Sequence, residues 1–151
     1  MMELRTYCRR TARAFQPRLQ LAAYARETGD RRLEAELLQE AVEIDPFVRQ
    51  VHVEYGRSCV ALERLQDAAR EFEMALAVLP DMDRRWVEDP ERRPRLDAPE
   101  FLEEQAALRV ELARVLLRLD RDEAAREQLE RALLDAPKGD AAAAARELLD
   151  R

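Results

Sequence analysis

The sequence has very little of the chemistry that most catalytic and metal sites use. His52 is the only histidine among 151 residues, so neither a two-histidine zinc site nor a histidine-based nucleophilic set can be built. Gly29, Gly56 and Gly139 stand apart from one another, so there is no glycine-rich phosphate loop. We therefore expect no catalytic residues, no cofactor and no metal, and we expect His52 to be a partly exposed histidine on a helix surface.

Acidic residues are plentiful, but arginine recurs three or four residues away from them, as in Glu123/Arg126 and Glu127/Arg131. Such spacing is typical of solvated helix surfaces rather than of paired catalytic carboxylates. Together with the scarcity of histidine and glycine, this pattern predicts that the protein is not an enzyme.

Long hydrophobic runs and cysteine pairs are also missing. No apolar run approaches the roughly 18–20 residues of a membrane span. The first residues, MMELRTYCRRTARAF, lack the apolar centre of a signal peptide, although the doubled Met leaves open that the chain is a fragment. Cys8 and Cys59 lie on apolar helical faces without a partner nearby, so we expect no disulfide. These features predict a cytoplasmic, reducing environment.

Lysine, asparagine and isoleucine are nearly absent. Lys138 is the only lysine among 26 basic residues, Ile44 is the only isoleucine, and asparagine does not occur. The codons of all three amino acids are AT-rich, so the composition indicates a GC-rich bacterial genome.

The net charge of −6 argues against nucleic acid as a partner, because phosphate binding needs a basic surface. The stretch from Met1 to Gln20 carries Glu3 as its only acidic residue, whereas acidic residues are in excess from Pro99 onward. The arginines of that first stretch are Arg5, Arg9, Arg10, Arg13 and Arg18. Ends of opposite sign would steer a charged partner or favour head-to-tail association of the chain with itself.

What the sequence does have is an internal repeat. Pro46 and Pro80 close the similar segments GDRRLEAELLQEAVEIDP and ERLQDAAREFEMALAVLP, and a third ending, DRDEAAREQLERALLDAP, closes at Pro137. The interval from Pro46 to Pro80 equals the period of about 34 residues that is typical of certain helix–turn–helix solenoids. The units of a solenoid bury their apolar faces by stacking on one another.

The second segment shows two amphipathic helices. Apolar residues at three-to-four spacing predict a first helix from about Arg49 to Leu62 and a second from about Leu65 to Val78. Gly56 lowers helix stability relative to alanine, so we expect a close helix–helix approach at that position. Pro80 follows because proline cannot continue a helix.

These features resemble the tetratricopeptide repeat family over about residues 15–82 and 106–139. The resemblance lies in a bulky–small pair on each first helix, a large apolar residue and a small residue on each second helix, and a closing proline. The residues are Leu21–Ala22, Tyr55–Gly56 and Leu112–Ala113, followed by Leu38 and Ala41, Phe72 and Ala75, and Leu129 and Ala132. The resemblance implies an all-α, right-handed α-solenoid of three helix–turn–helix units with flanking N- and C-terminal helices.

The sequence departs from the family pattern at two places. Glu34 stands where Ala68 and Ala125 provide a small residue, which predicts looser helix pairing in that unit or a rotation that uses Ala35. The aromatic residue often found near the start of each first helix is replaced by a basic one: Arg18, His52 and Arg109.

We divide the chain into an N-terminal helix (1–14), unit 1 (15–48), unit 2 (49–82), an insert with a helix extension (83–105), unit 3 (106–139) and a C-terminal capping helix (140–151). The middle of the insert, rich in proline and charge, is typical of a loop. Asp97 with Glu100 predicts an N-cap for a long helix from about Ala98 to Leu119, and Asp140 predicts a cap for the last helix. An alternative is that the insert folds over the groove that the family resemblance implies along the first helices.

The resemblance places a binding groove on the first helices, and it implies a protein or peptide partner. The groove residues would be Gln16, Leu19, Gln20, Ala23, Gln50, Val53, Glu54, Arg57, Ala107, Val110, Glu111 and Arg114. A groove with apolar patches and charges suits an extended or helical segment. The alternative is that Glu54/Arg57 and Glu111/Arg114 are ordinary i,i+3 surface pairs. The lysines and asparagines with which one branch of the family clamps a C-terminal carboxylate are absent.

Trp86 in the insert is a further candidate, either as an interface anchor or as a side chain tucked back onto the solenoid. The leading hypothesis is a non-catalytic interaction scaffold. The alternatives are a self-assembling structural solenoid, with the chain as a homo-oligomer, and a helical accessory domain of a larger enzyme.

Overall fold

The computed structural model describes residues 15–151, so the expected N-terminal helix and Cys8 lie outside the described residues. Within that range the chain forms eight α-helices and one 3-10 turn, and no strand. The helices are α2 (Phe15–Glu27), α3 (Arg31–Ile44), α4 (Arg49–Ala61), α5 (Leu65–Ala77), α6 (Arg84–Val87), α7 (Pro99–Arg118), α8 (Asp122–Asp135) and α9 (Asp140–Leu149), with the 3-10 turn η1 at Pro90–Arg92.

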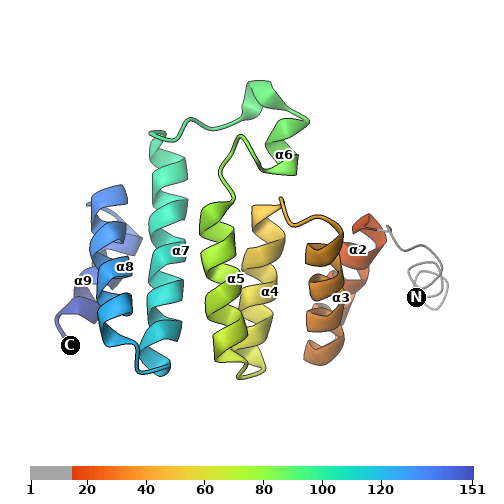
Figure 1. Ribbon diagram of the computed structural model, residues 1–151, viewed down its shortest axis with the longest axis horizontal. Helices are drawn as coiled ribbons and strands as arrows, with labels where there is room; N and C mark the ends of the chain where they lie inside the picture. The colour runs from red at the N-terminus through yellow and green to blue at the C-terminus, as the bar shows by residue number, and fades with distance from the viewer. Residues whose placement is uncertain (1–14) are drawn as a thin grey trace.

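The long helices stack in chain order as an α-solenoid. Within the described part of the chain, α2 packs on α3, α3 on α4, α4 on α5, α5 on α7, α7 on α8, and both α7 and α8 on α9. Figure 1 shows the resulting row of upright helices, with α2–α3 and α8–α9 at opposite ends. A closed bundle would bring those ends together. The prediction of an all-α solenoid is therefore confirmed.

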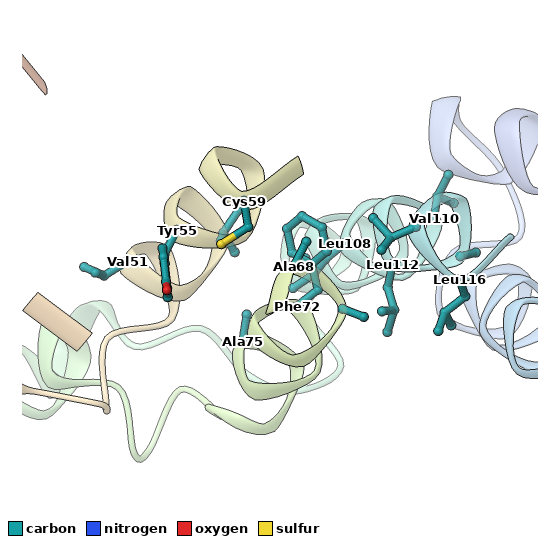
Figure 2. Close-up of a cluster of buried hydrophobic side chains, with 14 of the residues drawn as sticks. Val51, Tyr55, Cys59, Ala68, Phe72, Ala75, Leu108, Val110, Leu112 and Leu116 are labelled. Carbon is teal, nitrogen blue, oxygen red and sulfur yellow. The ribbon is translucent and has the colours of Figure 1, made fainter. Parts of the chain in front are cut away.

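Small side chains and one aromatic ring allow the helices to approach closely. Ala68 and Ala75 have no exposed surface and Phe72 has 1%. A Cβ atom on Gly56 of α4 would lie 2.6 Å from Cε1 of Phe72 on α5, so close that the ring or a helix would have to shift. Figure 2 shows Phe72 between Ala68 and Ala75 on α5. The close approach expected at Gly56 is confirmed.

The turn inside each helix pair has the same geometry in all three pairs. Gly29, Glu63 and Asp120 all adopt a left-handed φ, between 58° and 80°. In all three turns, the residue that follows the left-handed one donates its amide hydrogen to the carbonyl oxygen five positions earlier in the chain. These hydrogen bonds run from Asp30 to Ala25, from Arg64 to Cys59 and from Arg121 to Leu116. This is the Schellman ending of a helix. The backbone thus repeats with the sequence, at a longer interval where the insert intervenes.

The basic residues that replace the family's aromatic residue all bond to an acidic residue of the following helix. Arg18 Nε lies 2.6 Å from Glu40 Oε2, His52 Nδ1 2.7 Å from Glu71 Oε2, and Arg109 Nε 2.7 Å from Asp135 Oδ2. Arg18 and His52 are buried, and Arg109 is half-buried. A polar contact thus joins the two helices of each pair at this position.

The prediction of a partly exposed His52 is wrong, because its side chain is buried with 1% of its surface exposed. Its Nε2 lies 2.8 Å from the carbonyl oxygen of Pro46, so both ring nitrogens face acceptors. Burial lowers the pKa of His52, but the hydrogen bonds to Glu71 and Pro46 and the charge of Glu71 raise it more, and the net pKa lies above 6.5. The expected helical position is right, but the expected face is wrong, because a polar residue type does not reveal burial.

Glu34 is accommodated by charge pairing rather than by loose packing. It is 2% exposed, and its neighbour Ala35 is 1% exposed. Arg26 Nε lies 2.6 Å from Glu34 Oε1, and Arg31 Nη1 lies 3.1 Å from Oε2. The net effect is a raised pKa of Arg26, led by its hydrogen bond to Glu34. Two guanidinium groups thus allow a carboxylate where the other units have alanine.

The bounds of α4, α5 and α7 agree with the expected ones to within a residue, but two expected caps are wrong. The N-cap of α7 is Ala98 without a side-chain hydrogen bond, since Pro99 begins the helix with a preset φ and Asp97 pairs with Arg95. The N-cap of α9 is Gly139, and Asp140 is the first helical residue. The Ala141 amide donates instead to Glu103 Oε1 of α7, at 3.3 Å.

The insert contains a turn of α-helix, α6, and the 3-10 turn η1, where the composition indicated only loop. Asp83 anchors it: one carboxylate oxygen accepts from the Arg49 amide at 3.2 Å, and the other from the Arg85 amide at 3.0 Å. Figure 1 shows the insert along one end of the helix row, between the end of α5 and the start of α7.

A candidate groove along the first helices

The predicted groove residues lie on α2, α4 and α7 and differ in exposure. Val53 and Val110 are buried, with 7% and 3% exposed, whereas Leu19, Glu54 and Glu111 are half-buried. The others are exposed: Gln16, Gln20, Ala23, Gln50, Arg57, Ala107 and Arg114. The face thus combines buried valines with exposed polar side chains.

Two clefts flank α4. One, of about 90 Å³, lies between α4 and α7 and is lined by Arg49, Gln50, Val53, Arg57, Arg85, Glu104, Ala107, Leu108 and Glu111. The other, of about 350 Å³, lies between α4 and the adjoining ends of α2 and α3, and is lined by Arg26, Arg31, Glu34, Gln50, Glu54, Arg57 and Ser58. Gln50 and Arg57 line both clefts, so the two adjoin across α4.

Of the predicted groove residues, the structure brings six together in these clefts: Gln50, Val53, Glu54, Arg57, Ala107 and Glu111. Gln16, Leu19, Gln20 and Ala23 on α2, and Val110 and Arg114 on α7, lie outside the two linings. The clefts therefore centre on α4.

The charges on this face pair between helices. Arg57 Nη2 lies 3.0 Å from Glu111 Oε1, which joins α4 to α7. Arg26 Nη2 lies 3.3 Å from Glu54 Oε2, which joins α2 to α4. The alternative of i,i+3 pairs within one helix is therefore wrong for Glu54/Arg57, and Glu111 pairs with Arg57 rather than with Arg114. These two ion pairs between helices hold their side chains in place and so define the shape of the clefts.

Arg49 is the most unusual residue of the face, and sequence reasoning missed it. Its side chain is buried, with 4% of the residue exposed. Nη2 donates to Gln105 Oε1, and the guanidinium lies 5.2 Å from the centre of the Phe101 ring. Burial lowers the pKa of Arg49, while the charges of Glu104 and Asp83 raise it less. The repeat pattern marks position 49 only as the start of a helix.

The insert contributes Arg85 to the α4–α7 cleft, so it forms part of the wall there. Arg85 covers the ring of the half-buried Trp86 at 4.4 Å from the ring centre. No repeat spacing could have found Arg85, because the insert has no counterpart in the other units.

Other chemistry is scarce in the described part of the chain. Residues 15–151 contain no group of three or more His, Cys, Asp or Glu side chains that could hold a metal ion. No helix in the same range is long and apolar enough to cross a membrane. Cys59 is a free thiol without exposed surface, and burial raises its pKa to about 11.

Comparison with known proteins supports the architecture alone. The sequence matches none of the known protein-family models, and no curated protein is significantly similar to it. Among solved structures, the crystal structure of MamA matches with a TM-score of 0.63 and 14% identity, over 89% of this chain and 65% of MamA. The chain therefore spans just under two thirds of that protein's length. A likeness at this identity shows a shared fold, an α-solenoid of paired helices.

Proposed function

We propose that this protein is a non-catalytic interaction scaffold that binds a segment of a partner protein along α4, between α2 and α7. The observation that carries the proposal is the pair of adjoining clefts on either side of α4. Buried valine, exposed glutamine and arginine line them. Such a surface can bury apolar side chains of a peptide and hydrogen-bond its backbone.

The ion pairs across the clefts support this role. Arg57 and Glu111 are 56% and 30% exposed, so little free energy is lost if a ligand displaces their contact. Glutamine side chains offer both donors and acceptors, which an extended backbone can use. The face is held in shape yet retains hydrogen-bonding groups for a ligand.

Selection from a random peptide library displayed on phage, with the full chain as bait, tests the proposal. We expect peptides that bind the wild type but not a variant with Arg57→Glu and Arg114→Glu. The matched control is Arg92→Gln, whose arginine is 82% exposed on η1. Circular dichroism should show that all variants are folded at the temperature of the binding assay.

A charge swap separates binding from folding. Arg57→Glu with Glu111→Arg restores an ion pair between α4 and α7 but exchanges its ends. We expect the swap to restore the thermal stability lost in Arg57→Glu alone without restoring peptide binding. The groove is not the binding site if no peptide is selected. The same conclusion follows if every selected peptide binds the variant with Arg57→Glu and Arg114→Glu as well as it binds the wild type.

A further inference from the structure

The end of the solenoid that α7, α8 and α9 form carries a leucine-lined cleft of about 420 Å³. Its apolar lining comes from all three helices: Leu117 of α7, Leu129 of α8, and Leu148 and Leu149 of α9. Leu129 is buried, whereas the other three leucines are only half-buried. The outer face of a terminal solenoid unit is normally polar. Since ligand sites measure roughly 300–1,000 Å³, this end has room for side chains of another segment.

The rim of the leucine-lined cleft has an excess of unpaired negative charge. Its two basic residues, Arg126 and Arg151, each pair with a glutamate that lies four residues away in the chain and outside the lining. Asp122 and Glu123 also line the cleft, and neither forms an ion pair within residues 15–151. The cleft therefore favours an occupant that combines apolar side chains with positive charge.

The N-terminal stretch of the same chain has the complementary composition. Residues 1–14 contain four arginines and one glutamate. In a helix, Leu4 and Tyr7 would share one face. At 100° per residue, Arg5 and Arg10 would flank that face on its two sides. Such a segment can bury apolar side chains among leucines and place arginines beside acidic residues.

We propose that residues 1–14 of one copy dock in the leucine-lined cleft of a second copy and join the copies head to tail. Arg5 and Arg10 then lie beside the acidic rim. Figure 1 shows α2 at the opposite end of the helix row from α8 and α9, so copies stacked end to end bring the start of one chain to the cleft of the next.

This contact is heterologous, because it joins two different surfaces, and it therefore extends into chains or closes into rings. None of the residues that line the leucine-lined cleft also lines the clefts beside α4. Failure of the head-to-tail contact would therefore leave the proposed function standing.

Sedimentation velocity of the full chain, over a range of protein and salt concentrations, tests the contact. We expect the average mass to rise with protein concentration at low salt. The rise should diminish at high salt, because salt screens exposed ion pairs. A wild type that stays monomeric at every protein concentration in low salt would overturn the inference.

Charge reversals locate the two surfaces. Arg5→Glu with Arg10→Glu should weaken association by about tenfold or more, and so should Asp122→Arg with Glu123→Arg. The chain with all four reversals again has opposite charges at the contact, so it should regain association. If the four reversals together weaken association more than either pair does, the segment and the cleft do not meet. Asp122→Asn with Glu123→Gln is a milder change that should also weaken association, and it replaces the reversal if that variant does not fold.

Two further variants separate docking from a general effect of net charge. Glu36→Arg with Glu73→Arg makes the same charge change on exposed residues of α3 and α5 that form no ion pair within residues 15–151. This control should associate like the wild type. Leu4→Ser with Tyr7→Ser changes no charge and should weaken association. Equal weakening in the control, or full association of the serine variant, would overturn the docking of residues 1–14.

Discussion

At the scale of single residues, polar side chains between the paired helices contribute to the packing of each pair, and the apolar pattern of the sequence does not indicate this contribution. Arg18, His52 and Arg109 occupy the same position in the three pairs, and each bonds to an acidic side chain of the following helix. Buried ion pairs are weak contributors to net stability, but removing one partner leaves an uncompensated group. These positions should therefore be sensitive to single substitution.

The first prediction concerns the protonation of His52. Its net pKa is raised above 6.5, so the stability it contributes is present below pH 6.5 and is lost as the pH rises through the folded-state pKa. His52 is the only histidine, so its ring signal in an NMR pH titration is unambiguous. We expect a pKa above 6.5 in the wild type.

Glu71→Gln is the matched control for this titration. Burial, which lowers the pKa of His52, is then no longer offset by the charge of Glu71 and its charged hydrogen bond, so we expect the pKa to fall below its wild-type value. An unchanged pKa in Glu71→Gln would show that Glu71 does not raise it, and a wild-type pKa at or below 6.5 would contradict the raised pKa itself.

The second prediction concerns Gly56. Alanine would add helix propensity worth about 1 kcal/mol, but its Cβ would lie 2.6 Å from the ring of Phe72, which is itself 1% exposed. Overpacking a core costs about 1–3 kcal/mol, so steric conflict should prevail. We expect Gly56→Ala to lower the free energy of unfolding by about 1 kcal/mol in urea titrations.

A second substitution identifies the cause. In a Phe72→Leu background, where the ring is absent, Gly56→Ala should be neutral or stabilising. Equal destabilisation in both backgrounds would mean that Phe72 is not the obstacle.

At the scale of elements, the turn between paired helices is the unit that repeats most faithfully. All three turns place one residue in the left-handed region, but only the first uses glycine there. Glu63 holds φ at 59°, which costs a side-chain-bearing residue about 1 kcal/mol.

The third prediction follows from that strain. Glu63→Gly should raise the free energy of unfolding by about 1 kcal/mol relative to Glu63→Ala, since both lose the contact with Arg118 and only glycine relieves the backbone. Thermal or urea unfolding measures the difference. If alanine proved as stable as glycine, the turn would not hold the left-handed geometry in solution.

The fourth prediction concerns the insert. The N-cap of α4, Val48, has no side-chain bond to the helix, and Asp83 from the insert accepts from the Arg49 amide in its place. We expect Asp83→Ala to destabilise the protein by about 1–2 kcal/mol, the usual cost of losing a cap. Asp81→Ala, at an exposed neighbouring position, should stay within about 0.5 kcal/mol of the wild type. Similar effects of the two substitutions would contradict the capping role.

At the scale of the whole molecule, the fold was largely predictable, because small residues at a fixed interval define how helix pairs nest. Spacing alone identifies Gly56, Ala68 and Ala75, and all three are buried. The caps at Ala98 and Gly139 were missed because a proline and a distant Glu103 replace the local side-chain signal. The site was predictable only in part.

The family resemblance placed Gln50, Arg57 and Glu111 on one face, but it could not show that Arg57 reaches across to Glu111. It also missed Arg49 and Arg85, since burial of one and the position of the other depend on how the insert folds against α4. Contacts between units and non-repeated segments are tertiary facts, and a repeat period carries no information about them.

The most direct test of the central claim, that the face formed by α2, α4 and α7 binds a partner segment, is NMR chemical-shift mapping. Isotope-labelled full chain is titrated with a library-selected peptide. The account predicts that perturbed amides concentrate in α4 and the facing residues of α2 and α7. Perturbations confined to α5 and α8 would contradict it.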